Sequence, residues 1–375
     1  MTSKNVFAEY FFDSKMEQKY RRITVKIGSN VLTRKDGTLD VTRMSAIVDQ
    51  VAELRKLGIE IILVSSGAVA SGRSELKVSR KMDSVDQRQL FSAVGQAKLI
   101  RRYYDFFKEH HIAVGQVLTM KENFGTRRHY LNQRNCMMVM LENGVIPIVN
   151  ENDTISLTEL MFTDNDELSG LIATMMDADA LIILSNIDGI FTGNPSDPKA
   201  RVIREVNPGE DLTQYVQTEK SGFGRGGMIT KTTIARKVAE EGLDVFIANG
   251  KKDNILVDLI TRTEETTFTH FIPRKDEVSS VKKWISHSAG FAKGELHLNE
   301  EAVKAIKGRK AASILPVGVV KIEGDFEKDD IVKVVNHSGK AIGVGKVSCS
   351  ADEARDVIGK HDQKPLVHYD YLYLD

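Results

Sequence analysis

Cysteine is scarce in this sequence. Cys136 and Cys349 are the two cysteines among 375 residues, and they lie far apart in unlike surroundings. This excludes a disulfide framework and a cysteine-based zinc site, because both need several cysteines at short spacings. The scarcity is typical of a protein kept in a reducing compartment, so we predict a cytoplasmic location.

An excess of one charge and long apolar runs are also absent. Lysine and arginine total 52, as do aspartate and glutamate, so no global basic field points to nucleic acid. The longest apolar runs, such as 61–64 and 180–184, fall far short of the roughly 20 residues of a membrane-spanning helix. Residues 1–22 lack the apolar core of a signal peptide, which predicts an N-terminal tail or docking segment.

The chain is long enough for about two or three domains. Its 41% hydrophobic and 28% charged residues are ordinary for a globular protein. From about residue 23 to 249, short apolar runs alternate with helical patterns, which predicts an α/β fold with a mostly parallel open sheet sandwiched by helices. The expected strands cover 23–27, 59–64, 112–118, 145–149, 181–184 and 245–248, and the clearest helices cover 130–141, 168–176 and 231–241.

Small or polar residues follow four of these strands. Ligands of open α/β sheets bind beyond the carboxyl ends of the strands, so we expect these residues to converge on one crevice. They are Gly28-Ser29-Asn30, Ser65-Ser66-Gly67, Asn150-Glu151-Asn152-Asp153 and Ser185-Asn186.

A glycine-rich loop precedes the helix expected at 231–241. Gly222, Gly224, Gly226 and Gly227 lead to Lys231, and a helix N-terminus with a nearby lysine favours a phosphate. The loop does not fit a P-loop, which needs lysine directly after its second glycine. It also lacks the preceding strand of a dinucleotide-binding fingerprint, because residues 211–221 are polar. A flexible loop that caps the helix is the alternative.

Charged residues stand at two places where their charge needs an explanation, inside an expected strand and at the start of an expected helix. Lys26 lies inside the apolar run 23–27, where its ammonium must pair, face a ligand or extend to solvent from an edge strand. Asp164 and Asp166 open a helix, where they either cap its N-terminus or orient the ammonium groups of Lys26 and Lys231.

The composition changes after about residue 264. We expect a polar linker at 263–279, between a first domain at 23–262 and a mainly β domain at 280–375 with strands near 319–322, 331–335 and 341–347. The basic residues of this second region form either a solvated face or an RNA-binding surface. They are Lys282, Lys283, Lys304, Lys307, Arg309 and Lys310.

Taken in order, these motifs resemble those of the glutamate 5-kinase family, which are amino acid kinases with a C-terminal PUA domain. The resemblance covers residues 23 to about 361 and assigns 23–262 to the kinase domain and 280–375 to a PUA-like domain. It rests on Val25-Lys26-Ile27-Gly28-Ser29, Val64-Ser65-Ser66-Gly67-Ala68, Ile148-Val149-Asn150-Glu151-Asn152-Asp153, Asp164-Asn165-Asp166, and Gly224-Arg225-Gly226-Gly227-Met228-Ile229-Thr230-Lys231.

The resemblance implies transfer of the ATP γ-phosphoryl group to the side-chain carboxylate of L-glutamate, which gives glutamyl 5-phosphate for proline synthesis. Lys26 and Lys231 would contact the phosphates, Asp166 would hold both lysines, and Gly67 would offer a backbone N–H. Mg²⁺ would be held by phosphate oxygens and water, without a protein metal site. The implied glutamate ligands are Ser66, Asp153, Asn165 and Asp164, and the implied nucleotide ligands are Lys26, Ser185, Asn186, Arg225, Gly226, Gly227, Met228, Ile229, Thr230 and Lys231.

The chain departs from the family pattern on the nucleotide side, with Arg225 where threonine is common and Ser185-Asn186 where Thr-Asp is common. The family also implies a dimer or tetramer and feedback inhibition by proline. Two alternatives stay open: another amino-acid or carboxylate kinase of the same fold, and an RNA-binding protein that acts through the PUA-like domain. A nicotinamide-dependent oxidoreductase would need a strand just before Gly222, which the polar residues there do not predict.

Overall fold

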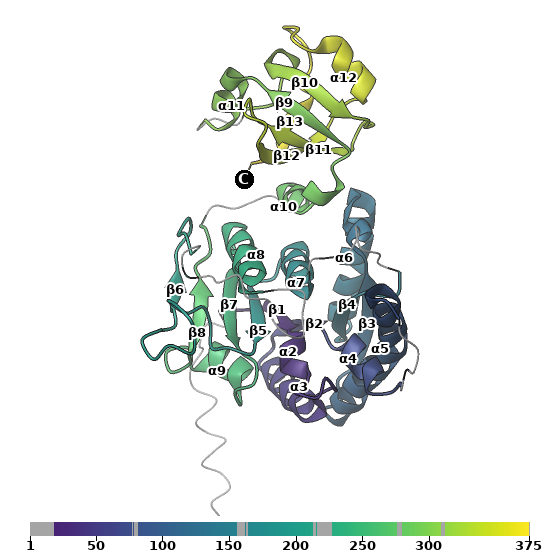
Figure 1. The fold of residues 1–375 in the computed structure, drawn as a ribbon, viewed down its shortest axis with the longest axis vertical. Helices are drawn as coiled ribbons and strands as arrows, with labels where there is room; N and C mark the ends of the chain where they lie inside the picture. Colours follow the sequence, from purple (N-terminus) through teal and green to yellow (C-terminus); the bar gives the residue numbers. More distant parts are fainter. Residues whose placement is uncertain are drawn as a thin grey trace, which may run out of the picture.

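The computed structural model describes residues 19–76, 78, 82–155, 162, 164–212, 215, 227–275, 280–308 and 312–374. Two sheets organise this part of the chain (Figure 1). Of the helices within these ranges, none is both long and apolar enough to cross a membrane.

The larger sheet is built as the alternating pattern predicts. Its strands are β1 Arg22–Ile27, β2 Glu60–Ser65, β3 Val114–Thr119, β4 Ile146–Glu151, β5 Ala180–Ser185, β6 Glu205–Val206, β7 Asp244–Asn249 and β8 Phe268–Phe271. They lie in the order β3-β4-β2-β1-β5-β7-β8-β6. All neighbouring pairs from β3 to β7 are parallel, and β8 runs antiparallel to β7. The mostly parallel sheet is therefore confirmed, with β1 at its centre.

Helices cover both faces of this sheet. Their bounds are α2 Ser29–Leu32, α3 Val41–Lys56, α4 Ala68–Arg73, α5 Ser84–Glu109, α6 Arg127–Glu142, α7 Asn165–Met175, α8 Met228–Glu240 and α9 Ile255–Thr261, with a short 3₁₀ turn η1 at Lys121–Phe124. Ile23, Val25 and Ile27 join the apolar core formed with α3, α5 and α9. Because side chains alternate along a strand, Lys26 points to the opposite face, where α7 packs against β1.

The second sheet is smaller and mainly antiparallel. Its strands are β9 Gly294–Leu298, β10 Val319–Gly324, β11 Ile331–Val335, β12 Ala341–Val347 and β13 Val367–Leu374, in the order β10-β9-β11-β12-β13. β9 and β11 are parallel, and the other neighbours are antiparallel. The region also contains α10 Ser280–Ser286, α11 Glu300–Ile306, α12 Ala351–Val357 and the 3₁₀ turns η2 Ala289–Phe291 and η3 Pro316–Gly318. The predicted mainly β second domain is confirmed.

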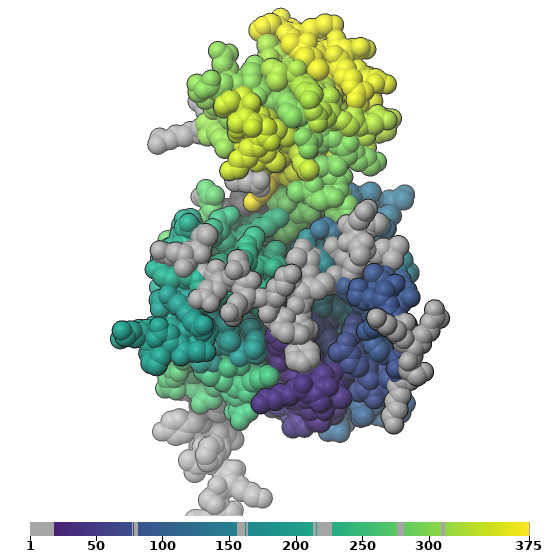
Figure 2. All heavy atoms as spheres, viewed as in Figure 1, coloured from purple at the N-terminus to yellow at the C-terminus, as the bar shows by residue number. Residues whose placement is uncertain are grey.

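This second domain lies on the side of the larger sheet that α7 and α8 cover (Figure 1). Its atoms lie directly against those of the first region (Figure 2). Trp284 of α10 is buried in an apolar cluster that includes Leu171 of α7. Its indole Nε1 donates to the carbonyl oxygen of Phe124 at 3.0 Å. Beside it, Ser286 Oγ donates to Glu241, just after α8, at 2.6 Å. The junction between the two parts is thus an apolar core with satisfied polar groups.

One strand lies inside the range that the composition predicted to be a linker. The range 263–279, expected to be a linker, contains β8, which pairs with β7. Because Thr269 and His270 are polar, β8 does not show the apolar pattern of a buried strand. Both side chains have polar partners in the structure. Thr269 Oγ1 donates to the Ile203 carbonyl at 2.7 Å, and His270 Nε2 lies 2.5 Å from Asp244 Oδ1. Residues 276–279 lie outside the described ranges.

The junction yields a stability prediction. Trp284→Ala removes a side chain that is 3% exposed and should lower the free energy of unfolding by about 3–5 kcal/mol. Trp284→Phe keeps most of the burial and loses one hydrogen bond, so it should cost about 1–2 kcal/mol. Urea unfolding followed by far-UV circular dichroism measures both losses. Tryptophan fluorescence cannot serve as the probe, because Trp284 is the sole tryptophan of the sequence.

Tyr104→Ala is the matched control, because this aromatic side chain is 54% exposed on α5 and should cost little. An unfolding midpoint for Trp284→Ala equal to that of Tyr104→Ala would mean that the junction contributes nothing to stability.

Candidate active site

The polar strand ends meet at one crevice, as their positions predict. A cavity of about 710 Å³ lies beyond the carboxyl ends of β1, β2, β4 and β5, within the size range of small-molecule sites. Every candidate residue that follows one of these strands and was expected to bind glutamate or nucleotide lines it. From the strand ends these are Ser66, Gly67, Asp153, Ser185 and Asn186, and from elsewhere Lys26, Asp164, Asn165, Gly227, Met228 and Lys231.

Asp166 joins the two lysines at the floor of this crevice. Its Oδ2 accepts from Lys231 Nζ at 2.8 Å, and its Oδ1 forms an ion pair with Lys26 Nζ. The Asp166 side chain is fully buried, whereas those of Lys26 and Lys231 are 5% and 12% exposed. One carboxylate thus lies between two ammonium groups that reach the cavity. Lys26 is therefore paired on a central strand and does not extend to solvent from an edge.

The pKa values of Asp164 and Asp166, at the start of α7, are shifted in opposite directions. Burial alone would raise the pKa of Asp166, but the charges of Lys26 and Lys231 lower it to about 2. Burial raises the pKa of Asp164 to about 6, and the negative charge of Asp166 adds to that rise. Asp166 is consequently the ionised partner of the lysines at neutral pH.

Local geometry holds these groups in place. Asp164 caps α7, because its Oδ1 accepts from the backbone N–H of Asp166 at 2.8 Å and of Glu167 at 3.2 Å. Gly67, at the end of β2, has φ +108°, a conformation that a residue with a Cβ rarely adopts. A Cβ there would also lie 3.3 Å from Leu39. This glycine lets the chain turn directly from β2 into α4 beside the cavity.

A polar network forms the side of the crevice between β2 and β4. Asn165 Nδ2 donates to Ser66 Oγ at 3.0 Å and to Asn150 Oδ1 at 2.9 Å. Asn150 Nδ2 in turn donates to Gln96 Oε1 at 2.9 Å. Two residues expected to bind glutamate, Ser66 and Asn165, therefore contact each other directly and face the cavity with Asn150.

Sequence reasoning missed Arg88, which lines the same cavity. It projects from α5, and its Nε donates to Asp153 Oδ1 at 2.9 Å. Its Nη2 donates to Glu151 Oε2 at 3.1 Å and also contacts Asp153. Glu151 is buried at the end of β4, so its charge needs this partner. No motif pointed to Arg88, because it is one of several basic residues on a long helix.

The nucleotide candidates divide into three groups. The first group lines the crevice and consists of Lys26, Ser185, Asn186, Gly227, Met228 and Lys231. Ile229 and Thr230 instead line a second cavity of about 310 Å³, bordered by residues 286–291 of the second domain. Arg225 and Gly226, with the rest of the loop 221–226, lie outside the described residues. Within the described ranges, no side chain caps the N-terminus of α8, which begins beside the crevice.

Comparison with known proteins agrees with this geometry. The profile of the amino acid kinase family matches residues 21–249, and that of the PUA domain matches residues 294–369. The first match spans strands β1 to β7 of the larger sheet and the crevice at their ends, and the second spans most of the smaller sheet. The chain therefore belongs to the amino acid kinase family.

Its curated relatives narrow the assignment. The glutamate 5-kinase of Bacteroides thetaiotaomicron is 70% identical over 360 residues, which cover 96% of this chain and 100% of that protein. The glutamate 5-kinase of Chlorobaculum tepidum is 45% identical over 361 residues, 95% of this chain and 98% of that one. The glutamate 5-kinase of Caldanaerobacter subterraneus is 38% identical over 354 residues, 93% and 94% of the two chains. Within its family, the chain belongs to the glutamate 5-kinases.

The two aspartates at the start of α7, Asp164 and Asp166, yield a stability prediction in which one variant is the control for the other. Asp166→Asn leaves two nearly buried ammonium groups without their counter-charge and should cost about 3–5 kcal/mol of unfolding free energy at pH 8. Since the pKa of Asp166 is lowered, this contribution is present above pH about 4 and is lost as the pH falls toward 2.

Asp164→Asn is the control, since asparagine also caps helices well. The pKa of Asp164 is raised to about 6, so its ionisation costs the folded state stability as the pH rises from about 4 to 6. Relative to wild type, Asp164→Asn should therefore gain stability over that window, whereas the loss in Asp166→Asn should stay nearly constant, because Asp166 is ionised above pH about 4 in both the folded and the unfolded state. Urea unfolding without ligands at pH 4.5 and pH 8 compares them; equal losses in both variants at pH 8 would contradict the assignment.

Proposed function

We propose that this protein transfers the γ-phosphoryl group of ATP to the side-chain carboxylate of L-glutamate. The product is L-glutamyl 5-phosphate, whose formation is the first step of proline biosynthesis. The observation that carries the proposal is the pair of ammonium groups, from Lys26 and Lys231, that Asp166 holds at the floor of a crevice large enough for both substrates. The glutamate 5-kinase names of the relatives support the choice of acceptor.

The reaction brings two anions together, so charge neutralisation and positioning are the main tasks of the protein. A carboxylate oxygen of glutamate attacks the γ-phosphorus, the bond from that phosphorus to the bridging oxygen breaks, and ADP leaves with the electron pair. The attacking carboxylate is already ionised at neutral pH, so no general base is needed. Lys26 and Lys231 stabilise the negative charge on the transferring group, and Gly67 supplies a backbone N–H at the end of β2.

Glutamate would bind on the side of the crevice formed by β2 and β4. Ser66 and Asn165 offer a hydroxyl and an amide to its carboxylates, and Asp153 offers a negative charge to its α-ammonium. Asp164 completes this set at the start of α7. Arg88, which pairs with Asp153, is placed to exchange that contact for the α-carboxylate of the substrate.

ATP would bind on the opposite side, toward β5 and α8. Ser185 and Asn186 border the crevice there, and the N-terminus of α8, with Gly227 and Lys231, suits phosphate oxygens. Both oxygens of Asp166 pair with lysines. Mg²⁺ would be held through phosphate oxygens and water, where it neutralises charge on the triphosphate.

The alternative of an RNA-binding protein is less well supported. Two of the lysines that suggested a basic surface form ion pairs, Lys283 with Asp177 at 3.3 Å and Lys304 with Glu300 at 3.2 Å. Arg309 and Lys310 lie outside the described residues. The cytoplasmic location stays a prediction of the sequence, and the dimer or tetramer and the inhibition by proline stay implications of the family resemblance.

The first test is an acceptor assay. Purified protein is supplied with ATP, Mg²⁺ and hydroxylamine and, in separate reactions, with L-glutamate, N-acetylglutamate, aspartate or carbamate. We expect ADP release and γ-glutamyl hydroxamate with L-glutamate, and a loss of roughly 100-fold or more in kcat for Lys231→Ala. Turnover with another acceptor would keep the fold and replace the substrate, and no turnover with any acceptor would favour the RNA-binding alternative.

A second prediction separates binding from chemistry. Asp153→Ala should raise the KM for glutamate by roughly tenfold or more, because it removes the charge proposed to contact the α-ammonium. The KM for ATP should change little. Asp105→Ala, which removes an exposed carboxylate on α5 paired with Arg101, is the control. Steady-state kinetics that show an unchanged glutamate KM would remove Asp153 from the substrate site.

A further inference from the structure

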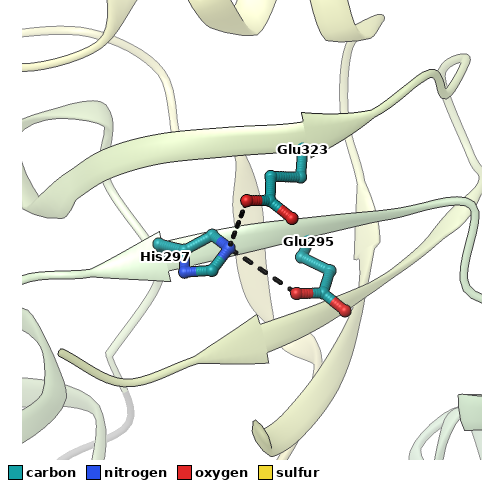
Figure 3. Close-up of side chains that lie close together, drawn as sticks. All are labelled: Glu295, His297 and Glu323. Atoms are coloured by element: carbon teal, nitrogen blue, oxygen red, sulfur yellow. Dashed lines mark ion pairs between the residues drawn. The ribbon is translucent and has the colours of Figure 1, made fainter. Parts of the chain in front are cut away.

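Three potential metal ligands meet on the outer face of the second sheet. Leu296 and Leu298 of β9 are buried in the core of the second domain, so Glu295 and His297 project from the other face of the strand. Glu323 of β10 lies directly opposite Glu295 in the antiparallel pair. Figure 3 shows both carboxylates turned toward the imidazole of His297.

The distances between these groups are too long for hydrogen bonds. His297 Nε2 lies 3.5 Å from Glu295 Oε2 and 3.8 Å from Glu323 Oε1, whereas an N–H···O bond spans about 2.7–3.2 Å. The Nε2 atom is itself buried and has no hydrogen-bond partner among the described residues. A buried nitrogen aimed at two carboxylates without bonding either one is unusual and needs an explanation.

A shared metal ion explains this spacing. One ligand atom from each residue lies within 4.8 Å of the other two. Ligands bound at about 2.0–2.2 Å to a tetrahedral ion are roughly 3.3–3.6 Å apart. We propose that Glu295, His297 and Glu323 bind a divalent metal ion with the ligand preference of Zn²⁺, with water at the fourth position.

Two lysines already offset the charge of the carboxylates. Lys333 Nζ lies 3.4 Å from Glu295 Oε1, which is not the oxygen that faces His297, so this contact is compatible with a bound ion. Lys321 pairs with Glu323 Oε1, the oxygen that faces His297. An ion must displace Lys321, whose side chain is 63% exposed and can move into solvent. Lys321 is thus a competitor of the metal.

The site lies on a different sheet from the kinase crevice. A metal ion would join β9 to β10 and thereby stabilise the second domain, because an ion that binds the folded state alone raises the free energy of unfolding with the logarithm of its concentration. It would take no part in phosphoryl transfer. These ligands form no local sequence motif, since Glu323 lies far along the chain from the other two residues and the strand pairing brings them together.

The test uses the full-length protein, stripped with a chelator and titrated with Zn²⁺ against a fluorescent zinc indicator. We expect one tight equivalent per chain for wild type. His297→Gln and Glu323→Gln should each weaken zinc binding tenfold or more. Lys321→Gln should strengthen it several-fold, because it removes the competing cation and leaves every ligand in place. Zn²⁺ should raise the melting temperature of wild type and not that of His297→Gln.

His368→Gln is the matched control, since this histidine lies in the same domain and contacts one carboxylate, that of Asp370, at 3.3 Å. It should bind zinc as wild type does. Equal zinc affinity in wild type and Glu323→Gln, or unchanged affinity in Lys321→Gln, would overturn the site. The Lys321→Gln result stays decisive even if His297→Gln does not fold, because it removes only an exposed side chain.

Discussion

The active site depends on one buried carboxylate between two ammonium groups. Burial of Asp166 by itself would favour its neutral form, yet Lys26 and Lys231 keep it ionised. The lysines depend on Asp166 in the same way, because a nearly buried ammonium without a partner is costly. This mutual requirement links β1, α7 and α8, which contribute one residue each. The fold can hold two ammonium groups beside the crevice because the carboxylate of Asp166 lies between them.

The same two helices contact the second domain. α7 and α8 begin at the crevice with Asp166 and Lys231, and they also border α10 and the residues that follow it. Trp284 packs into the cluster that contains α7, and Glu241, just after α8, accepts from Ser286. The second domain is therefore built onto the elements that carry Asp166 and Lys231, through an interface with an apolar centre and satisfied polar groups.

Much of the fold was predictable because it follows local rules. Apolar runs of strand length alternating with amphipathic helices indicated the parallel sheet, and the rule that ligands bind beyond the strand ends located the crevice. β8 was missed because its Thr269 and His270 look like linker residues until Ile203 and Asp244 satisfy them. Hydrogen bonds between residues distant in the sequence leave no periodic pattern.

The site was predictable in part, for related reasons. Lys26 and Lys231 were identifiable as charges in an apolar strand and after a glycine loop. Arg88 was not, because what distinguishes it from other basic residues of α5 is its contact with Glu151 and Asp153, which come from another strand. Ile229 belongs to the helix that carries Lys231, but helical rotation turns it to the second cavity.

The sequence by itself determined the class of fold, the strand ends that form the crevice and the two lysines, since these follow from hydrophobic periodicity, backbone geometry and the placement of charge along the chain. The tertiary structure decided which charges meet. It placed Asp166 between the lysines, Arg88 on Asp153, and Glu295, His297 and Glu323 around one point of the second sheet. Such encounters depend on strand order and register, which are set by the packing of the whole core and not by any one segment.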